Sequence, residues 1–252
     1  MSEHALFDGL LYASFVLSLI TAAYLSFATA PYGRHARAGH GAVVSNTLGW
    51  VLMEAPAALV PILLVVLSDR RDLTTWVFLA LWESHYLYRT LWYPWRIRQR
   101  GAALPLLIVL SGAVFNVLNG YLSFRYLTVF APGYGDAWLG DPRFVGGCAL
   151  FALGIAINRQ ADRILLSLRA PGETGYKIPH GGLYRYVSCP NYFGEVVEWC
   201  GWALLTYSLP GLSFALFTAA NLLPRALAHH RDYRRRFAEY PAQRRAVVPF
   251  VL

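Results

Sequence analysis

Seven apolar stretches, each close to the length needed to cross a lipid bilayer, constrain what this chain can fold into. A transmembrane helix needs about 20 apolar residues to cross about 30 Å of hydrocarbon. Charged residues make up only 14% of the 252 positions, against roughly 25% in soluble domains. We therefore expect an all-α integral membrane protein with seven transmembrane helices in a single domain, residues 1–252. The stretches cover approximately residues 7–29, 43–67, 74–95, 104–126, 144–166, 192–208 and 210–229.

The basic residues of the connecting loops predict the orientation. Loops with several Arg or Lys residues (30–42, 96–103, 167–191 and the C-terminal tail) alternate with poorer ones, and the 127–142 loop has neither Arg nor Lys. The positive-inside rule then places the C-terminus in the cytosol and the N-terminus outside. The first apolar run has no basic segment before it and no clear cleavage site, so we expect it to remain as the first span.

Charge and cysteine content exclude several classes of protein. The net charge of +8 comes from arginines in short loops and at span ends, so we expect no nucleic-acid partner. Cys148, Cys189 and Cys200 lack the spacing of a zinc site or a disulfide framework, and no metal is expected. We expect a monomer among membrane lipids. The preference for Arg over Lys favours a bacterial inner membrane, and a eukaryotic chain would lie in the endoplasmic reticulum.

Ionisable and polar residues inside the apolar stretches are the candidates for function, because such groups are costly in a bilayer. Glu54 lies in the second stretch and Arg89 in the third. Three further sets have helical spacing and therefore share a helix face: Asn158 and Asp162; Asn191, Glu195 and Glu198; Arg225, His229 and Tyr233. These stripes either pair as polar contacts between helices or line a cavity for a cytosolic nucleotide and a lipophilic substrate. No Rossmann or P-loop motif is present.

A string of short motifs keeps its order and spacing over the last hundred residues. It contains GIAINRQAD (154–162), LRAPGE (168–173), YKIPHGGL (176–183), NYFGE (191–195) and HHR (229–231). The N-terminal half adds YGRH (32–35), EAP (54–56) and HY (85–86). Together these motifs resemble the membrane steroid 5α-reductase family, the 3-oxo-5α-steroid 4-dehydrogenases, and above all its mammalian members.

The resemblance implies an NADPH-dependent oxidoreductase that reduces the Δ4 double bond of a lipophilic enone, a 3-oxo-Δ4-steroid. It implies hydride transfer to C5 while Glu54 and Tyr86 hydrogen-bond to the C3 carbonyl, and preorganised donors stabilise the growing enolate charge. Residues 1–126 would mainly form the substrate pocket and residues 143–252 the NADPH site. The cofactor residues implied are Tyr32, Arg89, Tyr93, Asn158, Asp162, Arg169, Tyr176, Asn191, Glu195, Arg225, His229, Tyr233 and Arg244.

Departures from the family pattern keep other activities open. Met53 stands where some mammalian members have Gln, and Cys189-Pro190 is a pair also seen in enoyl-CoA reductases, so another lipophilic enone or an enoyl thioester is an alternative substrate. A membrane methyltransferase that uses S-adenosylmethionine is a second alternative, and a transporter or lipid-binding protein is a third. Glu83 and His85 are interpreted as structural.

Overall fold

The computed structural model describes residues 2–28, 41–70, 72–97, 103–170, 173 and 175–252. The chain is all-helical apart from one small two-stranded sheet in the part described. It forms two compact units: Met1–Ala13 with Pro31–Phe144, and Ser14–Ala30 with Val145–Leu252. One boundary between the units lies between Phe144 and Val145, and the division into a substrate half and a cofactor half stays a prediction.

The first unit contains the start of α1 (Glu3–Phe27), a short antiparallel sheet of two strands that are distant in the sequence, and a series of helices that follow each strand. Local sequence signals begin these helices: the Ser45 hydroxyl accepts from the Leu48 N–H and the Asp72 carboxylate accepts from the Thr75 N–H, as N-caps do. The elements in order are β1 (Val43–Ser45), α2 (Asn46–Val66), α3 (Leu73–Leu87), the π-helix η2 (Tyr88–Trp92), α4 (Tyr93–Arg96), β2 (Ala103–Pro105), α5 (Leu106–Arg125), the π-helix η3 (Tyr126–Phe130) and the 3₁₀ turn η4 (Asp136–Gly140).

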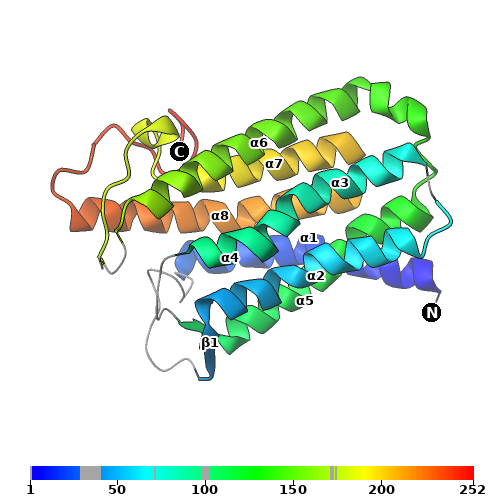
Figure 1. Cartoon of the computed structure of the whole chain (residues 1–252), viewed down its shortest axis with the longest axis horizontal. Coiled ribbons are helices and arrows are strands. Elements are labelled where there is room, and N and C mark those ends of the chain that lie inside the picture. Colours follow the sequence, from blue (N-terminus) through cyan, green and yellow to red (C-terminus); the bar gives the residue numbers. More distant parts are fainter. Residues whose placement is uncertain (1, 29–40, 71, 98–102, 171–172, 174) are drawn as a thin grey trace. The chain divides into compact units, whose positions relative to one another are not determined.

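Helices α2 and α5 form the main contact of the first unit, and both begin at the antiparallel pair β1–β2 (Figure 1). Glycines allow this approach. A Cβ added at Gly112 would lie 2.5 Å from Cγ of Met53, and one added at Gly120 would lie 3.3 Å from Cβ of Val60. Close backbone packing through small residues is typical of helix pairs in membranes, where lipid removes the hydrophobic drive for association.

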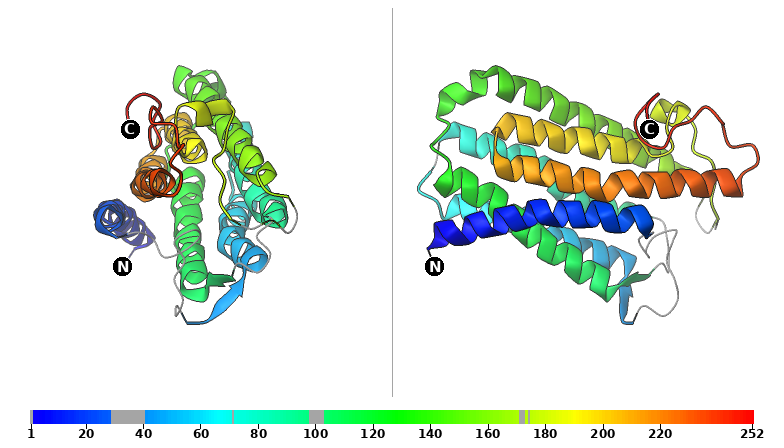
Figure 2. Two further views of the ribbon diagram at one scale, coloured as in Figure 1. Left: turned by 90° about the vertical axis from the view of Figure 1, so that its left-hand side faces the viewer. Right: turned by 180° about the vertical axis from the view of Figure 1, so that it is seen from behind.

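The second unit contains the rest of α1, α6 (Pro142–Ser167, entering from the first unit), the 3₁₀ turn η5 (Gly182–Arg185), α7 (Pro190–Thr206) and α8 (Leu209–Arg236). Helices α7 and α8 run side by side in every view (Figures 1 and 2). Glycines again join α6 to α7: a Cβ at Gly154 would lie 2.5 Å from the Gly194 carbonyl oxygen, and one at Gly194 would lie 2.6 Å from the Asn158 nitrogen.

The C-terminal tail folds back onto the start of α7. The Ser188 N–H donates to the Arg245 carbonyl at 2.9 Å, and the Cys189 N–H donates to the Ala246 carbonyl at 3.0 Å. Cys189 packs with Ala226 and Val247 in a small apolar cluster, which identifies it as a filler of the core. This return brings residues around 240–247 beside the helices of the second unit.

Among the residues that the structure describes, five helices are long and apolar enough to cross a membrane: α1, α2, α5 with η3, α6 and α8. The predicted stretches at 74–95 and 192–208 are helical too, as α3–η2–α4 and as α7. On their own, however, α3 has 15 residues and α7 has 17, below the usual spanning length. The all-α membrane class is therefore confirmed, whereas the count of seven spans stays a prediction.

Candidate functional site

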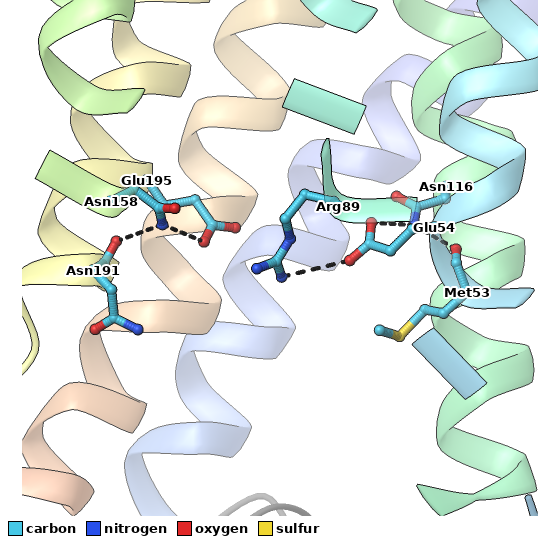
Figure 3. A network of polar contacts seen from close by, with 7 residues as sticks. All are labelled: Met53, Glu54, Arg89, Asn116, Asn158, Asn191 and Glu195. Atoms are coloured by element: carbon cyan, nitrogen blue, oxygen red, sulfur yellow. Dashed lines mark hydrogen bonds and ion pairs between the residues drawn. The ribbon is translucent and has the colours of Figure 1, made fainter. Parts of the chain in front are cut away.

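Glu54 is the centre of a polar cluster inside the first unit (Figure 3, right). Its side chain leaves α2 and is almost fully buried. The Arg89 guanidinium from η2 approaches one carboxylate oxygen at 3.6 Å, and the Asn116 amide from α5 donates to the other at 3.4 Å. Asn116 also donates to the Met53 carbonyl at 2.7 Å. Three elements therefore fix the position of one buried carboxyl group.

Arg89 is held on its other faces by aromatic rings. Its guanidinium carbon lies 4.6 Å from the centre of the Trp50 ring and 4.7 Å from that of Tyr93, distances typical of cation–π contacts. Arg89 belongs to the π-helical turn η2, and π-turns often occur at functional sites because they re-aim side chains. Two predicted cofactor residues, Arg89 and Tyr93, thus contact one another beside Glu54.

Tyr86 lies one helical turn before Arg89, on the same side of α3 and η2 by its spacing. It is 3% exposed and its ring packs against those of Trp82 at 4.8 Å and His85 at 4.9 Å. The Trp82 indole N–H donates to the Ala57 carbonyl of α2 at 2.7 Å, which ties α3 to the helix that carries Glu54. Both predicted catalytic residues therefore lie buried in the first unit.

A second polar cluster lies in the second unit, where α6 meets α7 (Figure 3, left). The Asn158 side-chain amide donates to the Asn191 backbone carbonyl at 3.0 Å and to the Glu195 carboxylate at 3.5 Å. Because α7 begins at Pro190, Asn191 and Glu195 share a helix face as their spacing predicts. The glycine-lined contact between α6 and α7 brings this face to Asn158.

A cationic and aromatic group occupies the neighbouring turns of α7 and α8. The Tyr192 hydroxyl shares a hydrogen bond of 3.1 Å with Nε2 of His229. The Arg225 guanidinium lies over the Tyr192 ring, 5.4 Å from its centre. Of these three residues, the sequence analysis had identified Arg225 and His229, and the structure brings them together through Tyr192.

Arg244 is the most unusual cation of the second unit, because it is only 4% exposed. One terminal nitrogen lies 3.4 Å from Nδ1 of His180, and the guanidinium sits over the Tyr240 ring at 5.1 Å. Its Nε and Nη1 atoms are buried and have no hydrogen-bond partner in the structure. The Tyr233 side chain is 3% exposed, and its ring stacks on the same Tyr240 ring, with the ring centres 5.3 Å apart. Buried arginine nitrogens without partners suit an anionic ligand such as a phosphate.

Tyr184 in η5 is a polar group of this unit that the sequence analysis missed. It is 1% exposed, and its hydroxyl has no partner in the part of the chain that the structure describes. Burial raises the pKa of this phenol well above its usual range, and the nearby acidic groups Cys189 and Asp162 add to the effect. Asp162 itself is 2% exposed on α6. Tyr184 lies between the predicted spans in the sequence, where no helical spacing indicates a buried side chain.

The remaining predicted residues lie in the 168–181 segment or outside the described residues. The Arg169 guanidinium donates to the Gly175 carbonyl at 3.4 Å, and the Tyr176 ring, 37% exposed, contacts the Arg236 guanidinium at 4.8 Å. The Lys177 ammonium, 2.5 Å from the Glu173 carboxylate, hydrogen-bonds to it and lowers the pKa of that carboxyl. Tyr32 falls among residues 29–40, outside the described part of the chain.

Comparisons with known proteins identify the family. The family model described as 3-oxo-5-alpha-steroid 4-dehydrogenase matches residues 102–252. The chain belongs to this family. Among its relatives, the bovine 3-oxo-5-alpha-steroid 4-dehydrogenase 1 is 41% identical, with all of this chain and 99% of the relative covered. The cotton steroid 5-alpha-reductase DET2 is 38% identical over 99% of both chains. The human 3-oxo-5-alpha-steroid 4-dehydrogenase 1 is 43% identical over 87% of this chain and 85% of its own.

Membership of the 3-oxo-5-alpha-steroid 4-dehydrogenase family confirms the resemblance drawn from the motifs, and makes this chain an integral membrane oxidoreductase of steroid metabolism. The family model covers residues 102–252, so Asn158 and Arg244 lie within the matched part. Glu54 and Tyr86 lie outside it but are covered by the full-length relatives. Within the described residues, no group of three or more His, Cys, Asp or Glu side chains is arranged to hold a metal ion.

Asn116 is the residue of the Glu54 cluster that sequence reasoning overlooked. The amides Asn158 and Asn191 are among the candidates named from the sequence, whereas Asn116 and Asn119, in the middle of the stretch at 104–126, are not. A buried amide in a membrane helix needs a partner for the same reason as a charge. The position of Asn116 within an apolar stretch is therefore a signal for a polar contact, although it does not identify Glu54 as the partner.

Proposed function

We propose that this protein reduces the Δ4 double bond of a 3-oxo-Δ4-steroid to the 5α-dihydro product. The observation that carries the proposal is the buried Glu54, anchored by Arg89 and Asn116 from two other elements and tied through Trp82 to the helix of Tyr86. The relatives are named as enzymes of this reaction, which supports the choice of an enone whose carbonyl the two side chains address.

Glu54 and Tyr86 would polarise the C3 carbonyl. When C5 of the enone gains a hydride, negative charge moves to the carbonyl oxygen, and hydrogen-bond donors placed in advance lower the barrier to that step. The Tyr86 hydroxyl is one donor. The Glu54 carboxyl, which is the carboxylate partner of Arg89 in the structure, is the other donor when it carries a proton in the substrate complex. Asn116 would fix the carboxyl rotamer, since it holds one oxygen and the adjacent Met53 carbonyl. The enolate is then protonated at C4.

NADPH is the cofactor we propose for the second unit. When bound, it would supply the hydride for C5. The orphaned Nε and Nη1 atoms of Arg244 fit a phosphate, and the Arg225 guanidinium beside Tyr192 adds a second positive charge. The Asn158–Glu195 pair and Tyr184 offer amide, carboxylate and hydroxyl groups to ribose or carboxamide. From the second unit the resemblance adds Asp162, Arg169, Tyr176, Asn191, His229 and Tyr233 to the proposed cofactor residues. It also implies Tyr32, Arg89 and Tyr93, which belong to the first unit.

The membrane arrangement belongs to the same proposal. Seven spans, with α3–η2–α4 as the third and α7 as the sixth, would place the N-terminus outside and the basic tail in the cytosol, where the cofactor is available. The membrane would be the bacterial inner membrane, or the endoplasmic reticulum in a eukaryotic cell. One chain carries both polar clusters, so we propose that it acts as a monomer.

The direct test uses the purified full chain in lipid nanodiscs with NADPH and testosterone or progesterone. Consumption of NADPH at 340 nm together with the 5α-dihydro product by mass spectrometry is the expected result. A medium-chain enoyl thioester and a non-steroidal cyclic enone are included as the competing substrates. If the protein reduces either of these compounds and none of the steroids, the proposed substrate is wrong. The substrate would then be another enone or an enoyl thioester, the alternative that Met53 and Cys189-Pro190 leave open.

Binding experiments separate the remaining classes. Isothermal titration with NADPH, NADH and S-adenosylmethionine should give binding with NADPH alone. Measurable affinity for S-adenosylmethionine and none for NADPH would favour the methyltransferase alternative. Flux of labelled steroid across proteoliposomes without cofactor would instead favour a transporter or lipid-binding protein.

A further inference from the structure

Glu83 is a buried carboxyl group that the proposed mechanism does not use. It lies in α3, is 8% exposed, and neither of its oxygens has a hydrogen-bond partner among the residues that the structure describes. A carboxyl group buried without a partner costs the fold free energy. The sequence analysis treats Glu83 as structural, but a structural carboxyl would be paired within the protein. Such orphaned groups mark places where water or a ligand completes the hydrogen bonds.

The position of Glu83 along α3 relates it to the proposed catalytic site. Tyr86 follows it by three residues and Thr90 by seven, so all three side chains lie along one side of the helix and its π-helical extension. The Thr90 hydroxyl, 5% exposed, is likewise buried without a partner. Two orphaned polar groups thus flank the tyrosine that we propose as a hydrogen-bond donor to the substrate carbonyl.

Two more orphaned atoms occur on α5, the helix whose Phe124 ring contacts Trp82 of α3. Trp82, the neighbour of Glu83, packs on Phe124 with ring centres 5.3 Å apart, and Phe124 follows Ser123. The Ser123 hydroxyl and the Asn119 amide nitrogen are buried and unpaired in the part of the chain that the structure describes. Polar atoms without partners among the described residues therefore occur on both α3 and α5 within the first unit, in addition to the Glu54 cluster.

We propose that Glu83 is a specificity-determining residue that hydrogen-bonds to a hydroxyl group on the ring system of the substrate. The inference rests on the proposed function, because it places the substrate carbonyl at Tyr86. A hydroxyl both donates and accepts a hydrogen bond, so it matches a carboxyl in either protonation state. A molecule of several fused rings held at Tyr86 extends further than one helical turn of about 5.4 Å and would pass the Glu83 side chain.

The test compares pairs of 3-oxo-Δ4-steroids that differ by one ring hydroxyl, such as progesterone against its 6-hydroxy and 11-hydroxy derivatives. The ratio of kcat/KM within each pair is measured for the wild-type chain, Glu83→Leu and Glu83→Gln, with Ser84→Ala on the exposed side of α3 as the control. In wild type and Ser84→Ala, kcat/KM for one of the hydroxylated steroids should exceed that for its parent by about tenfold. The reason is that the parent steroid, which lacks the hydroxyl, leaves the buried carboxyl of Glu83 without a partner. Glu83→Leu should reduce the ratio to about one, and Glu83→Gln should retain part of it.

Thermal unfolding distinguishes a binding role from a structural one. Glu83→Leu should unfold at the same temperature as wild type or higher, since it removes an unpaired buried carboxyl. Equal kcat/KM ratios in wild type and Glu83→Leu for every pair, or a clear loss of stability with unchanged ratios, would overturn the inference while the reductase assignment stands. Failure of the wild-type chain to reduce any of these steroids would instead overturn the proposed function itself.

Discussion

The Arg89 guanidinium lies 3.6 Å from the Glu54 carboxylate, and the two side chains are 12% and 10% exposed. A pair so deeply buried is sensitive to the loss of either member, because the remaining charge would be left without compensation. Arg89 was expected among the cofactor residues, and its contact with Glu54 gives it a position next to the proposed chemistry. The contact between Glu54 and Arg89 is therefore one interaction through which the proposed roles of both residues can be measured.

Replacing Glu54 by Gln should reduce kcat with a 3-oxo-Δ4-steroid by about a hundredfold or more, because the amide N–H is a weaker and less acidic hydrogen-bond donor than the O–H of a protonated carboxyl. It should also lower stability, because breaking a buried ion pair costs about 3–5 kcal/mol. Turnover by NADPH consumption and unfolding in urea measure the two effects. Glu239→Gln, an exposed change in the tail, is the matched control. Full turnover in Glu54→Gln would contradict the assigned role.

Replacing Tyr86 by Phe removes one hydroxyl and keeps the ring contacts with Trp82 and His85. We expect kcat to fall by about 10²–10³-fold, while the melting temperature changes little because the packing is preserved. Tyr12→Phe, on an exposed part of α1, should leave both quantities as in wild type. If Tyr86→Phe lost stability but kept its turnover number, Tyr86 would be a core residue rather than a donor.

The helices were predictable because their signals are local. The apolar run at 210–229 lies within α8 (Leu209–Arg236), and the chain turns between Thr206 and Leu209, where Tyr207 adopts the left-handed conformation. Likewise, Pro190 begins α7, so Asn191 and Glu195 share a face. Proline at a helix start and hydrophobic periodicity depend only on neighbouring residues.

The contacts within the site were not predictable in the same way. Nothing in the sequence near residue 89 indicates a π-helical turn, and two of the three partners of Arg89, Trp50 and Glu54, come from the distant helix α2. Arg244 is an ordinary tail arginine by sequence, and it becomes buried only because the strand-like segment at 245–246 pairs with Ser188 and Cys189. Such contacts depend on tertiary packing, which composition and spacing do not encode.

Arg244 should contribute to cofactor affinity through a phosphate. We expect Arg244→Met to raise KM for NADPH by about tenfold or more, and Arg244→Lys to restore only part of the affinity, because Lys lacks the planar fork that binds phosphate with two hydrogen bonds. The neighbouring Arg245 is exposed. Arg245→Met is therefore the matched control, because it removes one positive charge, as Arg244→Met does. An unchanged KM for NADPH in Arg244→Met would remove Arg244 from the proposed site.

Glycine 154 should be essential for the packing of α6 on α7. A Cβ there would lie 2.5 Å from the Gly194 carbonyl oxygen and against the Glu198 backbone, so Gly154→Ala forces the helices apart and should cost about 1–3 kcal/mol. Gly146→Ala is the matched control on the same helix, because its Cβ would meet only Leu204, at 4.0 Å. That change should be neutral or stabilise the helix by about 0.5–1 kcal/mol. Equal melting temperatures for the two variants would contradict the close contact.

The number of spans can be tested at the two helices that are too short on their own. If α3–η2–α4 and α7 cross the membrane, single cysteines placed at their two ends will be labelled from opposite sides. The pairs are Asp69→Cys with Arg96→Cys for the third span, and Tyr186→Cys with Leu209→Cys for the sixth, all at exposed positions.

The labelling variants are made in a chain with Cys148 and Cys200 replaced by Ser, while Cys189 stays in its buried cluster. In right-side-out vesicles or spheroplasts, a membrane-impermeant maleimide should react with the cysteines at 69 and 209. The cysteines at 96 and 186 should react only after the membrane is opened, as the positive-inside rule requires. Labelling of both members of a pair from the same side would show that the helix between them does not cross. The seven-span arrangement would then be wrong at that helix, even though its residues are helical.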